Sequence, residues 1–324
     1  MDLHLLENIV CIADEKSITK AAEKRFVTQS ALNQQLQKLE AELGVALFVR
    51  SRSNWQPTEA GRVYLSAARQ MLLMKKDAYQ QIADVAEKNS RHLSVGLIPE
   101  RGVEMFTAVY PAFHAAFPRV QLEPVECHVT AMQQMISQGL LDLGIATLSP
   151  EQRDENEYHV MAREEILLAV PAQHKLASGG SRNWSEADET DLSRFGDENF
   201  VRIYQRSTLF RLTQTLFDQA GFAPKVLFST ASNQSKYRIV ALGLGCALLP
   251  AVYALPGDEV VYFRLPQRPA WEITLCSRAG AYLGEAGLRY MELCRAYWQE
   301  RLKGSDREAF QEAGRIEEKK KDNG

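Results

Sequence analysis

Side chains that could support catalysis, redox chemistry or metal binding are scattered along this chain rather than gathered in motifs. None of the cysteines stands at a metal-ligand spacing; they lie at positions 11, 127, 246, 276 and 294. The adjacent Cys127 and His128 alone are too few ligands for a structural metal site. There is no HExxH, GxSxG, GxxxxGKS/T or GxGxxG motif, and Gly243 and Gly245 fall in a predicted helix-to-strand turn instead of a phosphate-binding loop. We therefore do not expect the protein to be an enzyme or to bind a metal ion or a cofactor.

The composition is that of an ordinary globular chain with two or three compact units. Of its 324 residues, 45% are hydrophobic and 24% are charged, which excludes a mostly disordered, collagen-like or disulfide-scaffold protein. The formal net charge of -3 is unevenly distributed. Residues 1–90 hold twelve Lys and Arg against eleven Asp and Glu, whereas residues 91–302 hold twenty against twenty-four. The acidic excess therefore lies in the middle block.

The sequence favours a protein of the reducing cytoplasm. Its first residues, MDLHLLENIVCIADEKS, lack the basic segment and cleavage site of a signal peptide. The uncharged stretch 239–257 approaches the length of a membrane span, but two glycines and two prolines break it. We expect no membrane association. We also expect Cys246 and Cys276, which fall in predicted strands, to be buried structural thiols rather than redox sensors.

Apolar spacing predicts three short helices within residues 1–48. They cover about 3–14, 18–25 and 28–43, and Ser17 and Thr28 serve as N-caps of the second and third. Ala21 and Ala22 are small enough to let the second and third helices approach closely, and Gly44 ends the third. This pattern is typical of a helix-turn-helix at about 18–37.

Two further elements follow. Short strands around 45–52 and 55–57 flank a basic tip, which predicts a wing. A long helix then begins after Thr58, and its apolar side chains keep close to the alternating threes and fours of a coiled coil. They are Tyr64, Ala67, Met71, Met74, Ala78 and Val85. We expect this run to pair with a second copy of the chain; packing on its own domain is the alternative.

From Arg91 onward, predicted strands and helices alternate. This order predicts a mostly parallel sheet with helices on its faces, and about two hundred residues suffice for two such lobes. The final residues, 303–324, are mostly charged with few apolar anchors, so we expect a solvated, disordered tail.

The segment SITKAAEKRFVTQSALNQQLQKLEAELGVALFVRSRSNWQPTEAG resembles the LysR-type transcriptional regulator family, and the resemblance extends over residues 1–302. Weaker matches are GLLDLGIA, PAQHKLA, QAGFAP and LGLGCALLP. The resemblance implies an all-α-type winged helix-turn-helix head, a linker and dimerisation helix, and a two-lobed α/β effector domain similar to periplasmic binding proteins. These parts would occupy residues 1–57, 58–90 and 91–302. Lobe I would hold about 91–163 and 268–302, and lobe II about 164–267.

The third helix departs from the family pattern, since Asn33 and Gln34 replace the usual Ser-Arg. Amide side chains can pair with adenine, and hydroxyl groups can reach phosphates or base edges. The expected DNA-binding residues are Thr28, Gln29, Ser30, Asn33, Gln34, Gln37, Lys38, Arg50 and Arg52. Phosphate contacts should come mainly from the wing arginines and from Lys16, Lys20, Lys24 and Arg25. Any single one of them could instead be a solvated surface residue.

The resemblance also places an effector pocket between the lobes, where helix N-termini favour a small anion. Pro99, Glu100 and Arg101 stand where relatives often have a small hydroxyl residue. The candidate effector-binding residues are Glu100, Arg101, Thr130, Arg206, Ser207, Thr208 and Asn233. The two arginines would favour a carboxylate or phosphate, whereas Glu100 would disfavour one or recruit an amine. All seven could equally serve as helix caps.

The sequence therefore indicates a DNA-binding transcriptional regulator whose oligomer responds to an unidentified small molecule. The effector would favour one arrangement of the lobes, and the linker helices would pass that shift to the DNA-binding heads. The expected partners are double-stranded promoter DNA, further copies of the chain in a homodimer or homotetramer, and RNA polymerase in the case of an activator. A solute-binding protein of the same two-lobed fold is the alternative, but the winged unit and the missing signal peptide argue against it.

Overall fold

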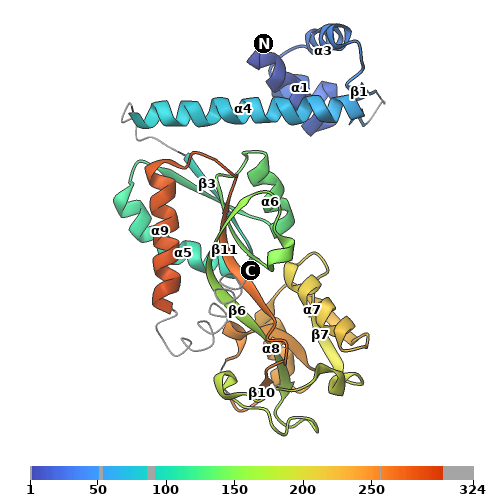
Figure 1. Cartoon of the computed structure of the whole chain (residues 1–324), viewed down its shortest axis with the longest axis vertical. Coiled ribbons are helices and arrows are strands. Elements are labelled where there is room, and N and C mark those ends of the chain that lie inside the picture. The colour runs from blue at the N-terminus through green and yellow to red at the C-terminus, as the bar shows by residue number, and fades with distance from the viewer. Residues whose placement is uncertain (1, 51–53, 86–91, 256, 302–324) are drawn as a thin grey trace, which may run out of the picture. The chain divides into compact units, whose positions relative to one another are not determined.

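The chain divides into two compact units, residues 1–88 (unit 1) and 89–324 (unit 2). The computed structural model describes residues 2–50, 54–85, 92–255 and 257–301 (Figure 1). Among these residues, no helix is both long and apolar enough to cross a bilayer.

Unit 1 opens with three helices, each of which begins at a side-chain N-cap. They are α1 (Leu3–Glu15), α2 (Ile18–Lys24) and α3 (Gln29–Leu43). The side chains of Asp2, Ser17 and Thr28 accept hydrogen bonds from backbone N–H groups two or three residues later, which satisfies donors of the first turn. Gly44 ends α3 in the left-handed conformation, at φ 71°. The three predicted helices are confirmed.

A small apolar core holds these helices together. Ala21 and Ala22 of α2 are buried, so the close approach expected of a helix-turn-helix is present. Leu32, Leu36 and Leu39 line the buried face of α3 at spacings of four and three. Most polar residues of α3 lie outside this face and are exposed.

The turn between α2 and α3 places a bulky residue where glycine is usual. Phe26 has φ 54°, and the N–H groups of Phe26 and Val27 bond back to the carbonyls of Glu23 and Ala22 at 3.1 and 3.0 Å. This is the hydrogen-bond pattern of a Schellman motif. The Phe26 side chain is nevertheless 96% exposed, so no packing offsets the unfavourable backbone.

A two-stranded wing follows. β1 (Phe48–Val49) and β2 (Gln56–Pro57) pair antiparallel, with Phe48 opposite Pro57. Phe48 is buried in the core of unit 1, and its ring lies 6.0 Å from that of Trp55. The predicted wing is present with shorter strands. Its tip, residues 51–53, lies outside the described residues.

The long helix α4 (Glu59–Val85) has two different sides. On one side, Leu65 lies in the core of unit 1, and α1 is held by the ion pairs Arg69–Asp14 at 2.5 Å and Lys75–Glu7 at 2.9 Å. The other side carries exposed apolar residues at spacings of three and four, here called the apolar stripe. The stripe consists of Val63, Ala67, Met71, Met74, Ala78 and Ile82.

Unit 2 alternates strands and helices. Its helices are α5 (Arg101–Ala116), α6 (Val129–Ser137), α7 (Thr208–Gln219), α8 (Asn233–Ala241) and α9 (Gly284–Arg301). Its strands are β3 (His92–Leu97), β4 (Gln121–Glu126), β5 (Leu143–Leu148), β6 (Glu157–Pro171), β7 (Asn199–Ile203), β8 (Lys225–Thr230), β9 (Ala247–Pro250), β10 (Val260–Phe263) and β11 (Ala270–Ser277).

The largest sheet has the order β10-β6-β11-β5-β3-β4, with β9 also paired to β6, while β7 pairs with β8. Strand β3 runs parallel to β4 and β5, but β9, β10 and β11 all pair antiparallel. The expectation of a mostly parallel sheet is therefore wrong. The reason is that β6 leads from one half of the unit to the other and β11 returns beside it, so the two strands must run in opposite directions.

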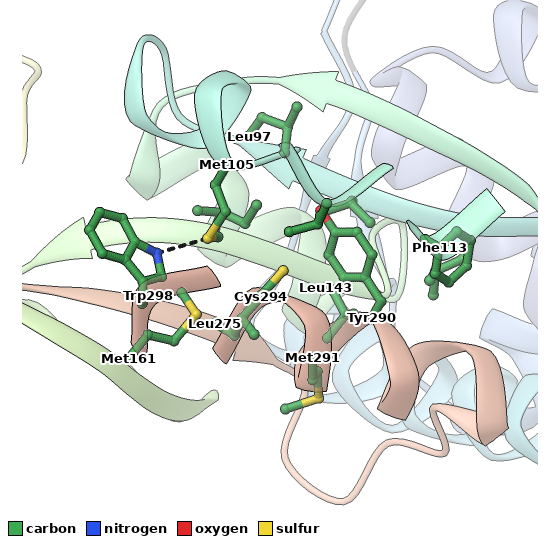
Figure 2. Close-up of a cluster of buried hydrophobic side chains, with 14 of the residues drawn as sticks. Leu97, Met105, Phe113, Leu143, Met161, Leu275, Tyr290, Met291, Cys294 and Trp298 are labelled. Atoms are coloured by element: carbon green, nitrogen blue, oxygen red, sulfur yellow. Dashed lines mark hydrogen bonds between the residues drawn. The ribbon is translucent and has the colours of Figure 1, made fainter. Parts of the chain in front are cut away.

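These two crossing strands define two lobes. Lobe I contains β3, β4, β5, α5, α6 and α9 together with the first half of β6, and lobe II contains β7 to β10, α7 and α8 with the second half. In lobe I, α5 and α9 pack on the sheet through Met105, Phe113, Tyr290 and Trp298 (Figure 2). The indole N–H of Trp298 points at the Met105 sulfur, 2.8 Å away. Lobe II has a core of its own around Phe200 and other aromatic rings.

Candidate functional site

The exposed face of α3 carries nearly all of its polar side chains. Thr28 caps the helix by accepting from the Ala31 N–H at 3.1 Å, and Asn33 is half-buried. The remaining predicted base-reading residues of this helix are exposed; they are Gln29, Ser30, Gln34, Gln37 and Lys38. Phe26, which the sequence analysis did not single out, is also exposed, two residues before the cap. This face offers hydrogen-bond donors and acceptors with little charge.

The wing arginine Arg50 is held in place by other groups of unit 1. Its guanidinium lies 2.6 Å from the Glu40 carboxylate and 5.7 Å from the centre of the Trp55 ring. Glu40 also accepts from the Leu47 N–H at 2.8 Å, which ties the wing to α3. Arg50 is therefore positioned, but its charge is partly neutralised. Arg52 lies outside the described residues.

Two of the cations expected at phosphates are engaged elsewhere. Lys24 lies 2.6 Å from Glu15, and this pairing raises the pKa of Lys24. Arg25 donates to Glu7 at 2.5 Å and to Asn8 at 2.9 Å. Since these bonds join α2 to α1, Arg25 has a structural task. Lys16 and Lys20 are exposed.

Residues predicted for self-association divide into two groups. Ala67, Met71, Met74 and Ala78 lie on the exposed apolar stripe of α4. Tyr64 instead packs half-buried against the core of its own unit, and this burial raises its pKa. The side chain of Val85 lies outside the described residues. Val63 and Ile82, which were not predicted, are 70% and 64% exposed and extend the stripe.

Unit 2 contains a cavity of about 530 Å³ between its lobes. It is lined by Ile98, Pro99, Glu100, Arg101, His128, Val129, Thr147, Ile203, Tyr204, Gln205, Arg206, Ser207, Thr208, Ser229, Ala231, Asn233, Tyr253 and Trp271. Six of the seven predicted effector residues are among them. The exception is Thr130, which is exposed and bonds to Arg211 of α7 at 3.3 Å. Among the described residues, no group of His, Cys, Asp and Glu could hold a metal ion.

The predicted hydroxyl residues at the start of α7 already have partners. Ser207 caps α7 by accepting from the Leu209 N–H at 3.2 Å. Thr208 donates to the carbonyl of Thr147 in lobe I at 2.7 Å, so it joins the two lobes. Arg206 is exposed at the cavity lining, where it adds positive charge to the N-terminal end of α7.

Arg101 differs from what its sequence position suggested. It is only 4% exposed, and it lies 2.7 Å from Glu164 and 3.0 Å from Glu104. Burial by itself would lower the pKa of Arg101, but the two carboxylates outweigh burial and raise it. Since its charge is balanced by buried Glu164, Arg101 is not an uncommitted cation for an anionic effector. It anchors the start of α5 instead.

Glu100 reaches across the cavity from lobe I to lobe II. Its carboxylate accepts from the Ser232 hydroxyl at 2.8 Å and from the Tyr253 hydroxyl at 3.0 Å. It also accepts from the backbone and side-chain N–H groups of Asn233 at 3.3 and 3.4 Å. Burial raises the pKa of Tyr253, so this phenol remains a donor. A cavity carboxylate is therefore already paired with the N-terminus of α8.

Behind Asn233 lies a buried amine that the sequence analysis missed. Lys236 is 2% exposed and donates to the Leu248 carbonyl at 2.5 Å and to the Asn233 side-chain oxygen at 3.3 Å. Burial lowers the pKa of Lys236 to about 7, although Glu100 opposes the shift. No local pattern distinguishes this lysine from a solvated one, so no sequence signal was there to find.

Two of the cysteines have the buried environments expected of structural thiols. Cys246 and Cys276 are buried, as predicted, and burial raises the pKa of each to about 12. Their thiolate forms are thus disfavoured near neutral pH.

Replacing the buried amine, Lys236→Met, should change how stability depends on pH. Because folding lowers the Lys236 pKa from 10.5 to about 7, the unfolded chain binds one more proton than the folded chain between these pH values. This group therefore makes the free energy of unfolding rise with pH, by about 1.4 kcal/mol per pH unit. Chemical denaturation should show that the free energy of unfolding of the wild type increases relative to that of the variant from pH 7 to pH 9. A difference that does not vary with pH would contradict the assignment, and exposed Lys225→Met is the control.

Comparisons with known proteins give matches to both units of the chain. Residues 3–62 match the domain described as "Bacterial regulatory helix-turn-helix protein, lysR family", and residues 86–299 match the "LysR substrate binding domain". The chain is 27% identical over 300 residues to the DNA-binding transcriptional dual regulator OxyR of Escherichia coli, covering 91% of this chain and 94% of that protein. It is 25% identical over 268 residues to the HTH-type transcriptional regulator AlsR of Bacillus subtilis, covering 82% and 86%.

Solved structures agree on the fold. A full-length OxyR variant from Pseudomonas aeruginosa superposes with a TM-score of 0.64 at 23% identity, covering 92% of this chain and 95% of that one. Full-length BenM superposes with a TM-score of 0.54 at 21% identity, covering 93% and 98%. Both domain matches, which together span most of the sequence, lead to the same conclusion: the chain belongs to the LysR family of DNA-binding transcriptional regulators.

Proposed function

We propose that residues 1–57 read promoter DNA, that residues 58–90 pair with a second copy of the chain, and that residues 91–302 bind a small-molecule effector between the lobes. The exposed face of α3 carries this proposal. Gln29, Gln34 and Gln37 present amides that can pair with adenine edges in the major groove. Lys20 adds an exposed cation on α2, suited to a phosphate. Phe26 offers an apolar contact beside the first turn of α3.

Variants of α2 and α3 should separate base reading from phosphate binding. Gln34→Ala should change the preferred base at one position of the site, by about 1–3 kcal/mol of discrimination, because one amide contact is lost. Lys20→Ala should weaken binding to all sequences alike and reduce the salt dependence by about one phosphate contact. Sites selected from a random DNA pool and titrated at several salt concentrations provide the measurement.

The control for these variants is Gln121→Ala, an exposed amide in unit 2. If both test variants weakened every sequence equally, the division of roles between α2 and α3 would be wrong. If the wild type selected no sequence even at low salt, the DNA-reading assignment itself would fail.

The apolar stripe of α4 supports the pairing of two chains. Side chains such as Val63, Met74 and Ile82 are at least 64% exposed, although their spacing is that of a buried helix seam. A second α4 is the occupant that matches this spacing. Two heads held together bind DNA more tightly than either does alone, because the second contact becomes intramolecular.

Met74→Glu should therefore shift the protein from dimer or tetramer toward monomer. A carboxylate in an apolar helix seam is costly because it loses its water. Sedimentation velocity at micromolar concentration measures the change, and Met74→Leu, which keeps an apolar side chain, should assemble normally. An unchanged sedimentation coefficient for Met74→Glu would place the interface elsewhere.

The interlobe cavity supports an anionic effector at its α7 side. Arg206 is exposed there, and the N-terminal end of α7 adds a positive dipole end. The wall also contains apolar groups, including Ile203 and Tyr204, that suit the carbon skeleton of a small organic acid.

A panel of small organic carboxylates should therefore contain compounds that raise the melting temperature of unit 2. Arg206→Ala should weaken the affinity for such a compound about ten-fold, because a charge-assisted contact is lost. Isothermal titration gives the affinity, and Arg295→Ala, an exposed arginine on α9, is the control. Equal affinity in wild type and Arg206→Ala would exclude this anchoring role.

We assign the protein to the cytoplasm, since its proposed partner is promoter DNA. We assign it no catalytic role, because regulators of this family act by binding. If the bound oligomer activates transcription, RNA polymerase is a further partner.

A further inference from the structure

The carboxylate of Glu100 lies in the interlobe cavity and joins the two lobes by hydrogen bonds. Four hydrogen-bond donors of lobe II surround one carboxylate of lobe I, at 2.8 to 3.4 Å. Two of them, the Ser232 hydroxyl and the Asn233 backbone N–H, stand at the first turn of α8, where the helix dipole favours negative charge. Tyr253 closes the site from the 3₁₀ helix Ala251–Tyr253. A carboxylate of the chain itself is thus held as an anionic ligand would be.

The backbone at Glu100 is bent to make this contact. Glu100 has φ 61° and ψ −78°, and the Arg101 N–H bonds to the Pro99 carbonyl at 2.8 Å. These are the angles and the bond of a classic-type γ-turn, which is rare and strained for a residue with a side chain. The neighbours hold the turn from both sides, since the backbone N–H of Gly102 bonds to Ile98 and Arg101 is fixed by Glu164. A strained residue kept in place by its surroundings is typical of a clamp or a switch.

The buried amine of Lys236 also favours a carboxylate at the position of Glu100. The Asn233 side chain donates to Glu100 and accepts from buried Lys236, so it links the carboxylate to the amine. The attraction between Glu100 and Lys236 acts across a site that is partly closed to water, where charges interact more strongly than at a surface. Releasing Glu100 would leave the lysine without this opposite charge.

We propose that Glu100 is a built-in carboxylate latch that holds lobe I and lobe II together. This inference rests on the proposed effector domain, and it adds a mode of regulation to it. Because the donors of α8 are taken by Glu100, the effector is left with the α7 end of the cavity near Arg206.

Hydrogen exchange of the full-length protein tests the latch without any effector. Glu100→Gln keeps the size of the side chain but removes its charge, so N–H groups at the start of α8 should exchange roughly ten-fold faster. Peptides that cover residues 230–238 report this change by mass spectrometry. Peptides from β3 and β4, within the sheet of lobe I, should be unaffected.

Tyr253→Phe tests the same contact from lobe II by removing one donor. It should speed exchange in the same peptide, and combining it with Glu100→Gln should add little, because both changes break one interaction. Glu126→Gln, an exposed carboxylate of lobe I, should have no effect. If Glu100→Gln left exchange at α8 unchanged, or if the two effects were fully additive, the latch would be disproved. Loss of effector binding by Arg206→Ala is a separate result and leaves the latch test intact.

Discussion

The geometry of unit 2 depends on one buried carboxylate at the point where its lobes meet. Glu164 of β6 is fully buried, and three elements satisfy it: Arg101 at 2.7 Å, Trp271 at 2.8 Å and the Val252 N–H at 3.1 Å. A buried charge needs such partners, and removing one partner of a buried ion pair typically costs about 3–5 kcal/mol. Satisfying Glu164 therefore brings α5 of lobe I, the returning strand β11 and lobe II to one place.

The pairing of Arg101 with Glu164 determines how the neighbouring residue Glu100 enters the cavity. With Arg101 held by Glu164, the preceding residue, Glu100, is turned toward lobe II and meets the first turn of α8. Lys236 lies behind that turn, where its side chain is buried and shielded from solvent. Glu100 is bonded by donors of lobe II, Arg101 is paired with Glu164, and Arg206 remains as an exposed cation of the lining.

Unit 1 offers mostly amide groups and few cations to the proposed DNA interface. Its recognition helix is rich in amides, Arg25 is engaged in holding α1, and Arg50 is partly neutralised by Glu40. One such head has little charge with which to bind phosphates. If two heads join through the apolar stripe, as proposed, the number of contacts doubles and DNA affinity depends on assembly.

The sequence by itself determined the local structure of unit 1 and the polar face of α3. Caps such as Ser17 and Thr28, and the leucine spacing of α3, act over a few residues, so a single chain reveals them. It also pointed to six residues that line the cavity. Only the tertiary structure decided what those residues do, as with Arg101, whose partner Glu164 is 63 positions away, and Glu100, which bonds to Ser232 132 positions away. The physical reason is that the charge state and partners of a polar side chain depend on burial and on distant segments, which no local pattern records.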